Sequence, residues 1–316
     1  MTAAPFYAAA PFYAAVADGP PGGYALWLHA ADGVRLRAAI WAGGAQGTVL
    51  LFPGRTEYVE KYGRAAADLA ARGFTTIAID WRGQGLADRP LTDRMTGHVD
   101  DFAAYQKDLD ALLRLAQEQA LPRPYFILAH SMGGCIALRG LMRKVQVQAA
   151  AFTAPMWGIS LAPWMRPFAV ALSTTASRFG QAHRYAPGTT AKTYVLEAPF
   201  TGNVLTTDEG MYGYMRAQVG LHPDLALGGP SMGWLHAALV ECQALALLPS
   251  PATPVLCALG TAEKVVDTTP VHLRMRQWPS GKLDLYPNAE HEIMMETPVM
   301  RARLFDTVAT LFHARA

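Results

Sequence analysis

The stretch Tyr125-Phe-Ile-Leu-Ala-His-Ser131-Met-Gly-Gly134 decides the fold. It joins a short, continuously apolar run, which is typical of a buried strand, to a serine and then to a helix. A turn of this kind lifts the serine hydroxyl out at the carboxyl end of a sheet strand, and it needs small residues two positions before and after the serine because the two backbones pack closely there. Ala129 and Gly133 meet this requirement. We therefore predict that Ser131 is a nucleophile.

A second serine stands in a literal G-x-S-x-G pattern, Gly229-Pro-Ser231-Met-Gly233. A nucleophilic serine of this type follows a strand directly, and the residues before Ser231 do not form one. Pro230 suits a loop that leads into a helix. We therefore interpret Ser231 as a helix N-cap.

Short apolar runs and segments with helical spacing alternate along most of the chain. Runs of strand length lie at Tyr24–His29, Val34–Trp41, Thr48–Phe52, Thr75–Asp80, Pro124–Ala129, Ala149–Thr153, Val255–Leu259 and Lys282–Tyr286, and helical spacing is found at Tyr58–Arg72, Val99–Gln119, after Ser131 and at Thr297–His313. Strands that are apolar on both faces and alternate with helices indicate a mostly parallel sheet covered by helices on both sides. We therefore predict an α/β fold.

The alternation of strands and helices stops between about Ala154 and Leu248, in a stretch rich in aromatic residues, Met, Gly and Pro. We predict that residues 24–153 and 249–316 form the α/β core and that residues 154–248 form an inserted, mainly helical cap. Residues 1–23 hold a short direct repeat followed by a Gly- and Pro-rich end. We interpret them as an N-terminal surface arm.

The composition excludes several classes of protein. Only 16% of the residues are charged and 51% are hydrophobic. The 27 basic and 25 acidic residues give a net charge of +2, and no run of Lys and Arg is long enough to follow a phosphate backbone. A nucleic-acid partner is therefore not expected. No apolar run reaches the roughly 18 to 20 residues of a membrane-spanning helix. The three cysteines lack the spacing of a metal site or a disulfide framework. We expect a cytoplasmic protein without a metal or another cofactor.

Four segments, in order, resemble the α/β-hydrolases, in particular the branch of bacterial lysophospholipase L2 and the monoacylglycerol lipases. They are Phe52-Pro-Gly-Arg-Thr-Glu-Tyr58 with Lys61-Tyr62, Asp80-Trp-Arg-Gly-Gln-Gly85, Gly97-His-Val-Asp-Asp-Phe102, and the stretch around Ser131. Ala129 departs from the pattern, since the family usually has Gly there. The resemblance extends from about residue 24 to the C-terminus and implies an α/β-hydrolase fold with a cap.

A serine hydroxyl needs a histidine base and a carboxylate that orients this base. In this fold the chain order is serine, acid, histidine. His272 and His313 fall in predicted helices, whereas His291 lies in a loop just beyond the last predicted strand. We therefore predict that His291 is the base, and the resemblance agrees.

The acid is expected after the strand Val255–Leu259, where Glu263 and Asp267 are the candidates. Glu263 stands where relatives usually have the catalytic aspartate, and the lysophospholipase L2 enzymes are similar in using glutamate. The resemblance therefore favours Glu263, with Asp267 as the alternative acid.

Two backbone N–H groups are needed to bind the oxyanion of the tetrahedral intermediate. By position these are the N–H of Met132, which follows the nucleophile, and the N–H of Arg55, in the loop after the first core strand. Two interpretations of the Arg55 side chain remain open: it meets a phosphate or carboxylate of a substrate, or it pairs with Glu57 or Glu60.

The predicted cap supplies apolar side chains for a substrate cleft. Flexible Met and broad Trp side chains suit an acyl chain, and the candidates are Met156, Trp157, Trp164, Met211 and Met215. The segment Ile159–Ala171 is also a candidate for transient contact with a membrane surface.

These observations predict a serine carboxylic-ester hydrolase that works through an acyl-enzyme. The resemblance implies monoacyl lipids as substrates, lysophospholipids or monoacylglycerols, and simple esters should also be accepted. One alternative is a prolyl iminopeptidase-like aminopeptidase, which needs acidic groups for the substrate amine. Acidic residues of the predicted cap that could serve are Glu197, Asp208, Glu209, Asp224 and Glu241. The other alternative is a non-catalytic binding protein on the same fold.

Overall fold

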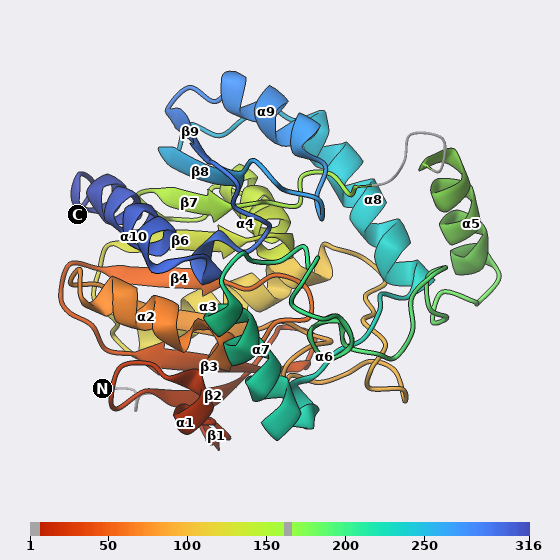
Figure 1. Cartoon of the computed structure of the whole chain (residues 1–316), viewed down its shortest axis with the longest axis horizontal. Coiled ribbons are helices and arrows are strands. Elements are labelled where there is room, and N and C mark those ends of the chain that lie inside the picture. Colours follow the sequence, from red (N-terminus) through yellow and green to blue (C-terminus); the bar gives the residue numbers. More distant parts are fainter. Residues whose placement is uncertain (1–6, 161–165) are drawn as a thin grey trace.

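A single sheet runs through the computed structural model, which describes residues 7–160 and 166–316 (Figure 1). Its described strands lie in the order β1-β2-β3-β5-β4-β6-β7-β8-β9. Their bounds are β1 Ala9–Ala10, β2 Tyr24–His29, β3 Arg35–Trp41, β4 Thr48–Phe52, β5 Thr75–Asp80, β6 Tyr125–His130, β7 Ala150–Thr153, β8 Val255–Gly260 and β9 Gly281–Tyr286. The pairs from β5 to β9 are parallel, and the pairs from β1 to β5 at the other edge are antiparallel. The prediction of a mostly parallel α/β sheet is confirmed.

Helices cover both faces of this sheet. The α-helices of the described chain are α1 Ala14–Ala17, α2 Gly63–Ala70, α3 Ala104–Glu118, α4 Met132–Met142, α5 Arg166–Arg178, α6 Tyr194–Glu197, α7 Glu209–Leu221, α8 Met232–Ala246, α9 Thr268–Arg276 and α10 Pro298–His313, and short 3-10 helices are η1 Val59–Tyr62, η2 Pro223–Leu225 and η3 Ile293–Met295. Side chains alternate along a strand, so β4 sends Leu50 and Phe52 to the cluster with α3 and α4, and Val49 and Leu51 to the cluster with α2 and α10. This alternation explains why each central strand is apolar throughout.

The stretch between β7 and β8, where the strand pattern stops, forms α5 to α8. In Figure 1, α5 lies on the far side of α8 from the sheet, and α7 lies near α1. Trp164 and Met165 lie outside the described residues. The boundaries of a cap at residues 154–248 stay a prediction.

The N-terminal stretch expected as a surface arm is built into the molecule from residue 9 onwards. Ala9 and Ala10 form β1 and pair with β2 at the sheet edge. The ring of Tyr13 stacks on His222 at 3.6 Å between centroids, and its hydroxyl donates to Asp224. The arm therefore joins the sheet edge to the stretch that follows α7.

Two further features bear on the environment of the chain. Among the described residues no helix combines the length and apolar character needed to cross a bilayer. Cys135, Cys242 and Cys257 are buried and free.

Candidate active site

Ser131 occupies a strained turn between β6 and α4. Its φ of 49° and ψ of −117° lie outside the usual regions for a residue with a side chain. A Cβ atom on Gly133 would overlap the carbonyl oxygen of Phe52, so only glycine fits there. Ala129 is fully buried, and its methyl group packs in the core, so the molecule accommodates this departure from the family pattern. The turn presents the Ser131 hydroxyl at the carboxyl end of the parallel strands.

The structure brings Ser131, His291 and Glu263 into one hydrogen-bonded chain. His291 Nε2 lies 3.0 Å from Ser131 Oγ, and His291 Nδ1 lies 2.7 Å from Glu263 Oε2. Glu263 follows β8 and His291 follows β9, so three strands deliver the three groups to one edge of the sheet. An imidazole held between a hydroxyl and a carboxylate can take the hydroxyl proton and keep its own orientation.

The Glu263 carboxylate is held in its ionised form. Burial raises its pKa, but the hydrogen bond and charge of His291, together with the N–H groups of Val266 and Val265, outweigh burial and keep the pKa of Glu263 below its ordinary value. Asp267, the alternative acid, instead caps α9 by accepting from the N–H of Thr269 at 3.0 Å. Glu263 is thus the candidate that contacts the imidazole.

The two predicted oxyanion donors flank the serine. Met132 is the first residue of α4, where a backbone N–H has no partner within the helix and the positive end of the helix dipole favours an anion. Arg55 lies in the loop that follows β4 and lines the same cavity as Ser131. No backbone acceptor in the described chain takes either N–H.

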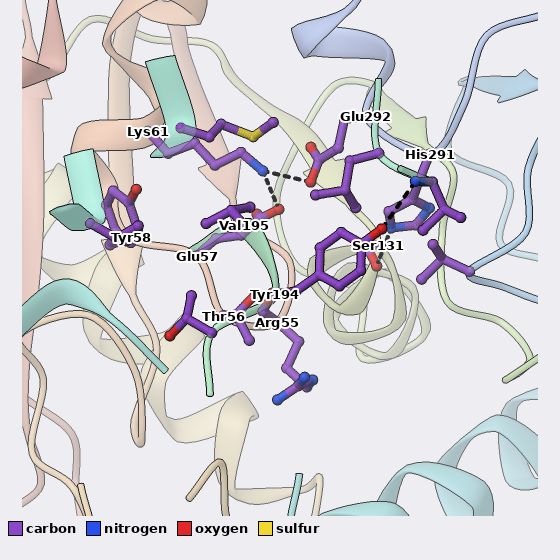
Figure 2. Close-up of a pocket in the computed structure, with 16 residues that line it drawn as sticks. Arg55, Thr56, Glu57, Tyr58, Lys61, Ser131, Tyr194, Val195, His291 and Glu292 are labelled. Carbon is purple, nitrogen blue, oxygen red and sulfur yellow. Dashed lines mark hydrogen bonds and ion pairs between the residues drawn. The ribbon is translucent and has the colours of Figure 1, made fainter. Parts of the chain in front are cut away.

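A buried cluster of charged groups, which sequence reasoning missed, adjoins the serine (Figure 2). Lys61 Nζ lies 2.6 Å from both Glu57 Oε1 and Glu292 Oε1, and His130 Nε2 lies 3.2 Å from Glu292 Oε2. Burial lowers the pKa of the Lys61 ammonium, but Glu292 and Glu57 outweigh burial and raise it. The sequence held one signal for this cluster. Glu57 and Lys61 stand four residues apart in the segment after β4, a spacing that allows an ion pair, and they lie close to Arg55.

This charged cluster, formed by Glu57, Lys61, His130 and Glu292, joins the loop after β4 to the loop after β9. Glu57 accepts hydrogen bonds from the N–H of Gly54 and the hydroxyl of Tyr62. Glu292 follows His291 directly and is tied to Glu57 through Lys61. Glu57, His130 and Glu292 could together offer donors to a metal ion, but the Lys61 ammonium already supplies positive charge to both carboxylates.

A cavity of about 280 Å³ opens beside the serine. Its apolar wall comes from Val195, Val204, Leu205, Met215, Val219 and Val265, and its polar wall from Arg55, Thr56, Glu57, Tyr58, Lys61, Ser131, Thr193, Tyr194, His291 and Glu292. Valine and leucine side chains scattered over the chain carry no sequence signal for a shared wall, which explains why most of these residues escaped prediction.

Of the predicted substrate-binding residues, Met215 lines this cavity. The other described members of the set are packed elsewhere. Met156 and Trp157 belong to the core on one face of the sheet, where the Trp157 ring stacks on Trp278, and Met211 belongs to the core on the other face. Trp164 lies outside the described residues. Large apolar side chains fill interiors more often than clefts, and hydrophobicity alone does not separate the two.

Ser231, in the literal G-x-S-x-G pattern, caps α8 as predicted. Its Oγ accepts from the N–H of Trp234 at 3.0 Å and lies 2.7 Å from His98 Nδ1, while His98 Nε2 lies 3.1 Å from Asp100. This second serine–histidine–aspartate chain has no exposed hydroxyl, because Ser231 is fully buried. A substrate carbonyl cannot reach it.

The sequence and the fold are similar to those of known hydrolases. Residues 43–298 match the family described as serine aminopeptidase, S33 (Hydrolase_4). The chain belongs to this family. Lysophospholipase L2 of Escherichia coli K12 is 34% identical to this chain over 280 residues, which are 84% of this chain and 80% of that protein. A probable lysophospholipase L2 of Haemophilus influenzae is 27% identical over 262 residues, 82% of each chain.

Solved structures share the fold of this S33-family chain. A carboxyl esterase from Bacillus coagulans superposes with a TM-score of 0.72 at 16% identity, covering 93% of this chain and 98% of that one. A soluble variant of monoglyceride lipase from Saccharomyces cerevisiae gives a TM-score of 0.70 at 20% identity, covering 92% and 94%. The protein is an α/β-hydrolase similar to lysophospholipase L2, and a serine hydrolase of the esterase and lipase type.

Proposed function

We propose that the protein hydrolyses the carboxylic ester of monoacyl lipids, lysophospholipids or monoacylglycerols, and also accepts simple carboxylic esters. The observation that carries this proposal is the hydrogen-bonded chain from Ser131 through His291 to Glu263 at a cavity with an apolar wall. The names of the lysophospholipase L2 relatives support the substrate class. An apolar wall suits an acyl chain because its burial contributes about 25 cal/mol per Å².

The proposed reaction passes through an acyl-enzyme. Ser131 Oγ adds to the ester carbonyl carbon while His291 Nε2 takes its proton, and the N–H groups of Arg55 and Met132 bind the oxygen that becomes negative. The carbonyl re-forms, and the alcohol leaves with the proton from His291. Water then attacks the acyl group in the same way, with His291 as base, and the fatty acid is released.

The Ser131→Ala variant tests this proposal. We expect turnover of p-nitrophenyl esters and of lysophosphatidylcholine to fall at least about 10³-fold, because the nucleophile is missing. The Ser231→Ala variant is the matched control, since it removes the same hydroxyl from a buried helix cap. Activity retained in Ser131→Ala and lost in Ser231→Ala would refute the assignment of the nucleophile.

An aminopeptidase is the second candidate, and the family description is its motivation. The acidic residues of the predicted cap that could bind an amine have other contacts: Glu241 pairs with Arg139, Glu197 with Lys192, Asp208 caps α7, and Asp224 accepts from Tyr13. Glu57 and Glu292 line the cavity, but both pair with Lys61. Glu209 does not line the cavity in the described chain. We therefore expect proline p-nitroanilide to be cleaved far more slowly than esters, and the reverse order of rates would favour the aminopeptidase. Labelling of Ser131 by a fluorophosphonate probe distinguishes both from a non-catalytic binding protein.

Contact with a lipid surface is part of the same proposal. Phe168 and Leu172 of α5 and Phe179, which directly follows α5, are 70%, 49% and 75% exposed. Their helical spacing places them on one side of a helix remote from the sheet, which suits shallow insertion among lipid headgroups. A Phe168→Ser, Phe179→Ser variant should sediment less with anionic vesicles than the unsubstituted protein, and equal sedimentation would count against this contact.

A cytoplasmic location belongs to the proposal as well, and the three free, buried cysteines are consistent with it.

A further inference from the structure

The charged cluster beside Ser131 takes one side chain from each segment that holds a candidate catalytic group. These three neighbours are Glu57, two positions after Arg55, His130, directly before Ser131, and Glu292, directly after His291. The fourth member, Lys61, lies 2.6 Å from a carboxylate oxygen of both Glu57 and Glu292, and Figure 2 shows it between them. The cluster therefore connects segments that are far apart in sequence and that meet at the site.

Hydrogen bonds around Glu57 orient the Arg55 N–H. The Glu57 carboxylate accepts from the N–H of Gly54, and Gln84 Nε2 donates to the carbonyl oxygens of Gly54 and Glu57 at 2.7 and 3.1 Å. The Gly54 carbonyl and the Arg55 N–H belong to one planar peptide unit, so fixing the carbonyl also fixes the direction of that N–H. The Arg55 guanidinium instead donates to the Gly228 carbonyl at 2.9 Å, so Glu57 acts on Arg55 through the backbone and not through an ion pair.

Glu292 is fixed at the other end of the link, in the loop that carries His291. One of its carboxylate oxygens faces Lys61 Nζ, and the other lies 3.2 Å from His130 Nε2. Burial raises the pKa of Glu292, but the charges of Lys61 and His130 outweigh burial and hold this pKa well below its ordinary value. The backbone N–H of Glu292 also donates to the carbonyl oxygen of Leu205 at 2.7 Å. Glu292 is therefore an ionised group next to the base, held by both its side chain and its backbone.

Lys61 joins these two ends by charge-assisted hydrogen bonds, which are short and strong. Both carboxylates are buried, so moving either of them away from the ammonium would leave a buried charge without its partner. We propose that Lys61 is a positioning residue, which holds the Arg55 N–H and the His291 imidazole at the separation that ester attack by Ser131 requires. This inference rests on the proposed function, because it concerns the geometry of that reaction.

A second buried cation provides the matched control. Arg37 lies between Asp80 and Glu60, the other acid considered as a partner of Arg55, and each carboxylate is 2.7 Å from a guanidinium nitrogen. All three side chains are fully buried, as in the Lys61 cluster, but neither carboxylate adjoins a candidate catalytic group in sequence. Arg37 also does not line the cavity within the described residues. Arg37→Met should therefore destabilise the fold as Lys61→Met does and leave the reaction geometry in place.

Steady-state kinetics of the two variants test the proposal, with active sites counted by complete labelling with a fluorophosphonate probe. For Lys61→Met we expect kcat per active site for p-nitrophenyl butyrate to fall about 10²-fold, as for a displacement of about 1 Å, with KM within about twofold of the unsubstituted protein. For Arg37→Met we expect fewer active sites and an unchanged kcat per site. Lys61→Arg should recover part of kcat, because a guanidinium can donate to both carboxylates.

The double variant Lys61→Met, Glu292→Gln separates positioning from stability. It removes a buried negative charge left without its cation, so urea unfolding should show it to be more stable than Lys61→Met. Its kcat per site should stay low, because the link between the two loops is still missing. Recovery of kcat together with stability would overturn the proposal, as would equal kcat per site in Lys61→Met and Arg37→Met.

Two further outcomes have distinct meanings. A rise in KM with unchanged kcat in Lys61→Met would place Lys61 against the substrate and would also overturn the positioning role. Failure of the proposed function would appear differently, as no Ser131-dependent hydrolysis or labelling in the protein without substitutions.

Discussion

Two serines in this chain have a histidine and a carboxylate in line, and their surroundings give them opposite roles. Ser131 sits on a backbone turn with positive φ at the edge of a cavity, and Ser231 lies fully buried at the start of α8. The three residue types alone therefore do not define a catalytic serine. The strand before Ser131 and the proline before Ser231 are the sequence features that separate them, and both can be recognised without a structure.

The contact between Glu263 and His291 leads to the first prediction. Glu263→Gln keeps the side-chain shape but removes the charge that stabilises protonated His291, so kcat should fall about 10³- to 10⁴-fold, as for the equivalent change in a serine protease. Asp267→Ala removes a helix cap and should lower the free energy of unfolding by about 1 kcal/mol with activity largely kept. Ester hydrolysis and urea unfolding of both variants check this. A larger loss of kcat in Asp267→Ala would assign the acid to Asp267.

The lowered pKa of Glu263 gives a second prediction, on stability. Because its pKa is lower in the folded than in the unfolded chain, ionised Glu263 stabilises the fold above its unfolded pKa of about 4.3, and this stabilisation is lost as the pH falls through the folded value. Glu263→Gln lacks this contribution. The difference in unfolding free energy between the unsubstituted and variant proteins, from urea titrations, should be largest near neutral pH and shrink below about pH 4. A difference independent of pH would contradict the assignment.

At the scale of elements, Lys61 connects the loop after β4 to the loop after β9. Lys61→Met would leave Glu57 and Glu292 buried without their shared cation, and we predict a loss of about 3–5 kcal/mol in the free energy of unfolding. Lys192→Met is the control, because the Lys192–Glu197 pair is exposed and such pairs contribute about 0–1 kcal/mol. Urea unfolding compares the two variants. Equal losses would show that the buried cluster does not stabilise the fold.

The sequence predicts best those strands and helices whose own apolar pattern decides their structure. The central strands are apolar throughout, and their bounds agree with prediction to within a residue or two, as at Thr48–Phe52 and Val255–Gly260. The strand Ala9–Ala10 could not be predicted, because two alanines have no strand preference until β2 offers them an edge. The helix expected at Tyr58–Arg72 begins as a 3-10 turn, where Asp80 accepts from the N–H of Val59.

The candidate site also contains residues that local sequence predicts and residues that only the fold brings together. The positions of Ser131 and His291 could be predicted because each follows a predicted strand at the same edge of the sheet, whereas only the resemblance favoured Glu263 over Asp267. The cluster around Lys61 could not, since Glu57 and Glu292 are 235 residues apart in sequence position and only the fold brings them together. The apolar wall escaped prediction for the same reason: Val195 and Val265 come from separate parts of the chain.

At the scale of the whole molecule, Tyr214 of α7 connects the N-terminal arm to the core. Its hydroxyl donates to the carbonyl of Ala17 at 2.7 Å and lies 3.1 Å from that of Glu60. Tyr214→Phe leaves the Ala17 carbonyl without this donor, while the Glu60 carbonyl still accepts from Gln218 Nε2, and we predict a loss of about 1–3 kcal/mol in unfolding free energy. Because Met215 and Val219 of the same helix line the cavity, KM for long-chain esters should rise more than kcat falls. Tyr212→Phe, whose hydroxyl contacts Ala198 instead of the arm, is the control, and an equal effect there would argue against this link.

The place of α5 to α8 between β7 and β8 has a consequence for how the chain can be divided. Ser131 and the loop that holds Arg55 precede these helices in sequence, and Glu263 and His291 follow them. A break in the backbone between α5 and α6 would therefore put Ser131 on one polypeptide and Glu263 and His291, its proposed acid and base, on the other. Neither fragment would contain the complete hydrogen-bonded chain of Ser131, His291 and Glu263. Fused to two interacting proteins, such halves would form a split reporter whose ester turnover measures their association.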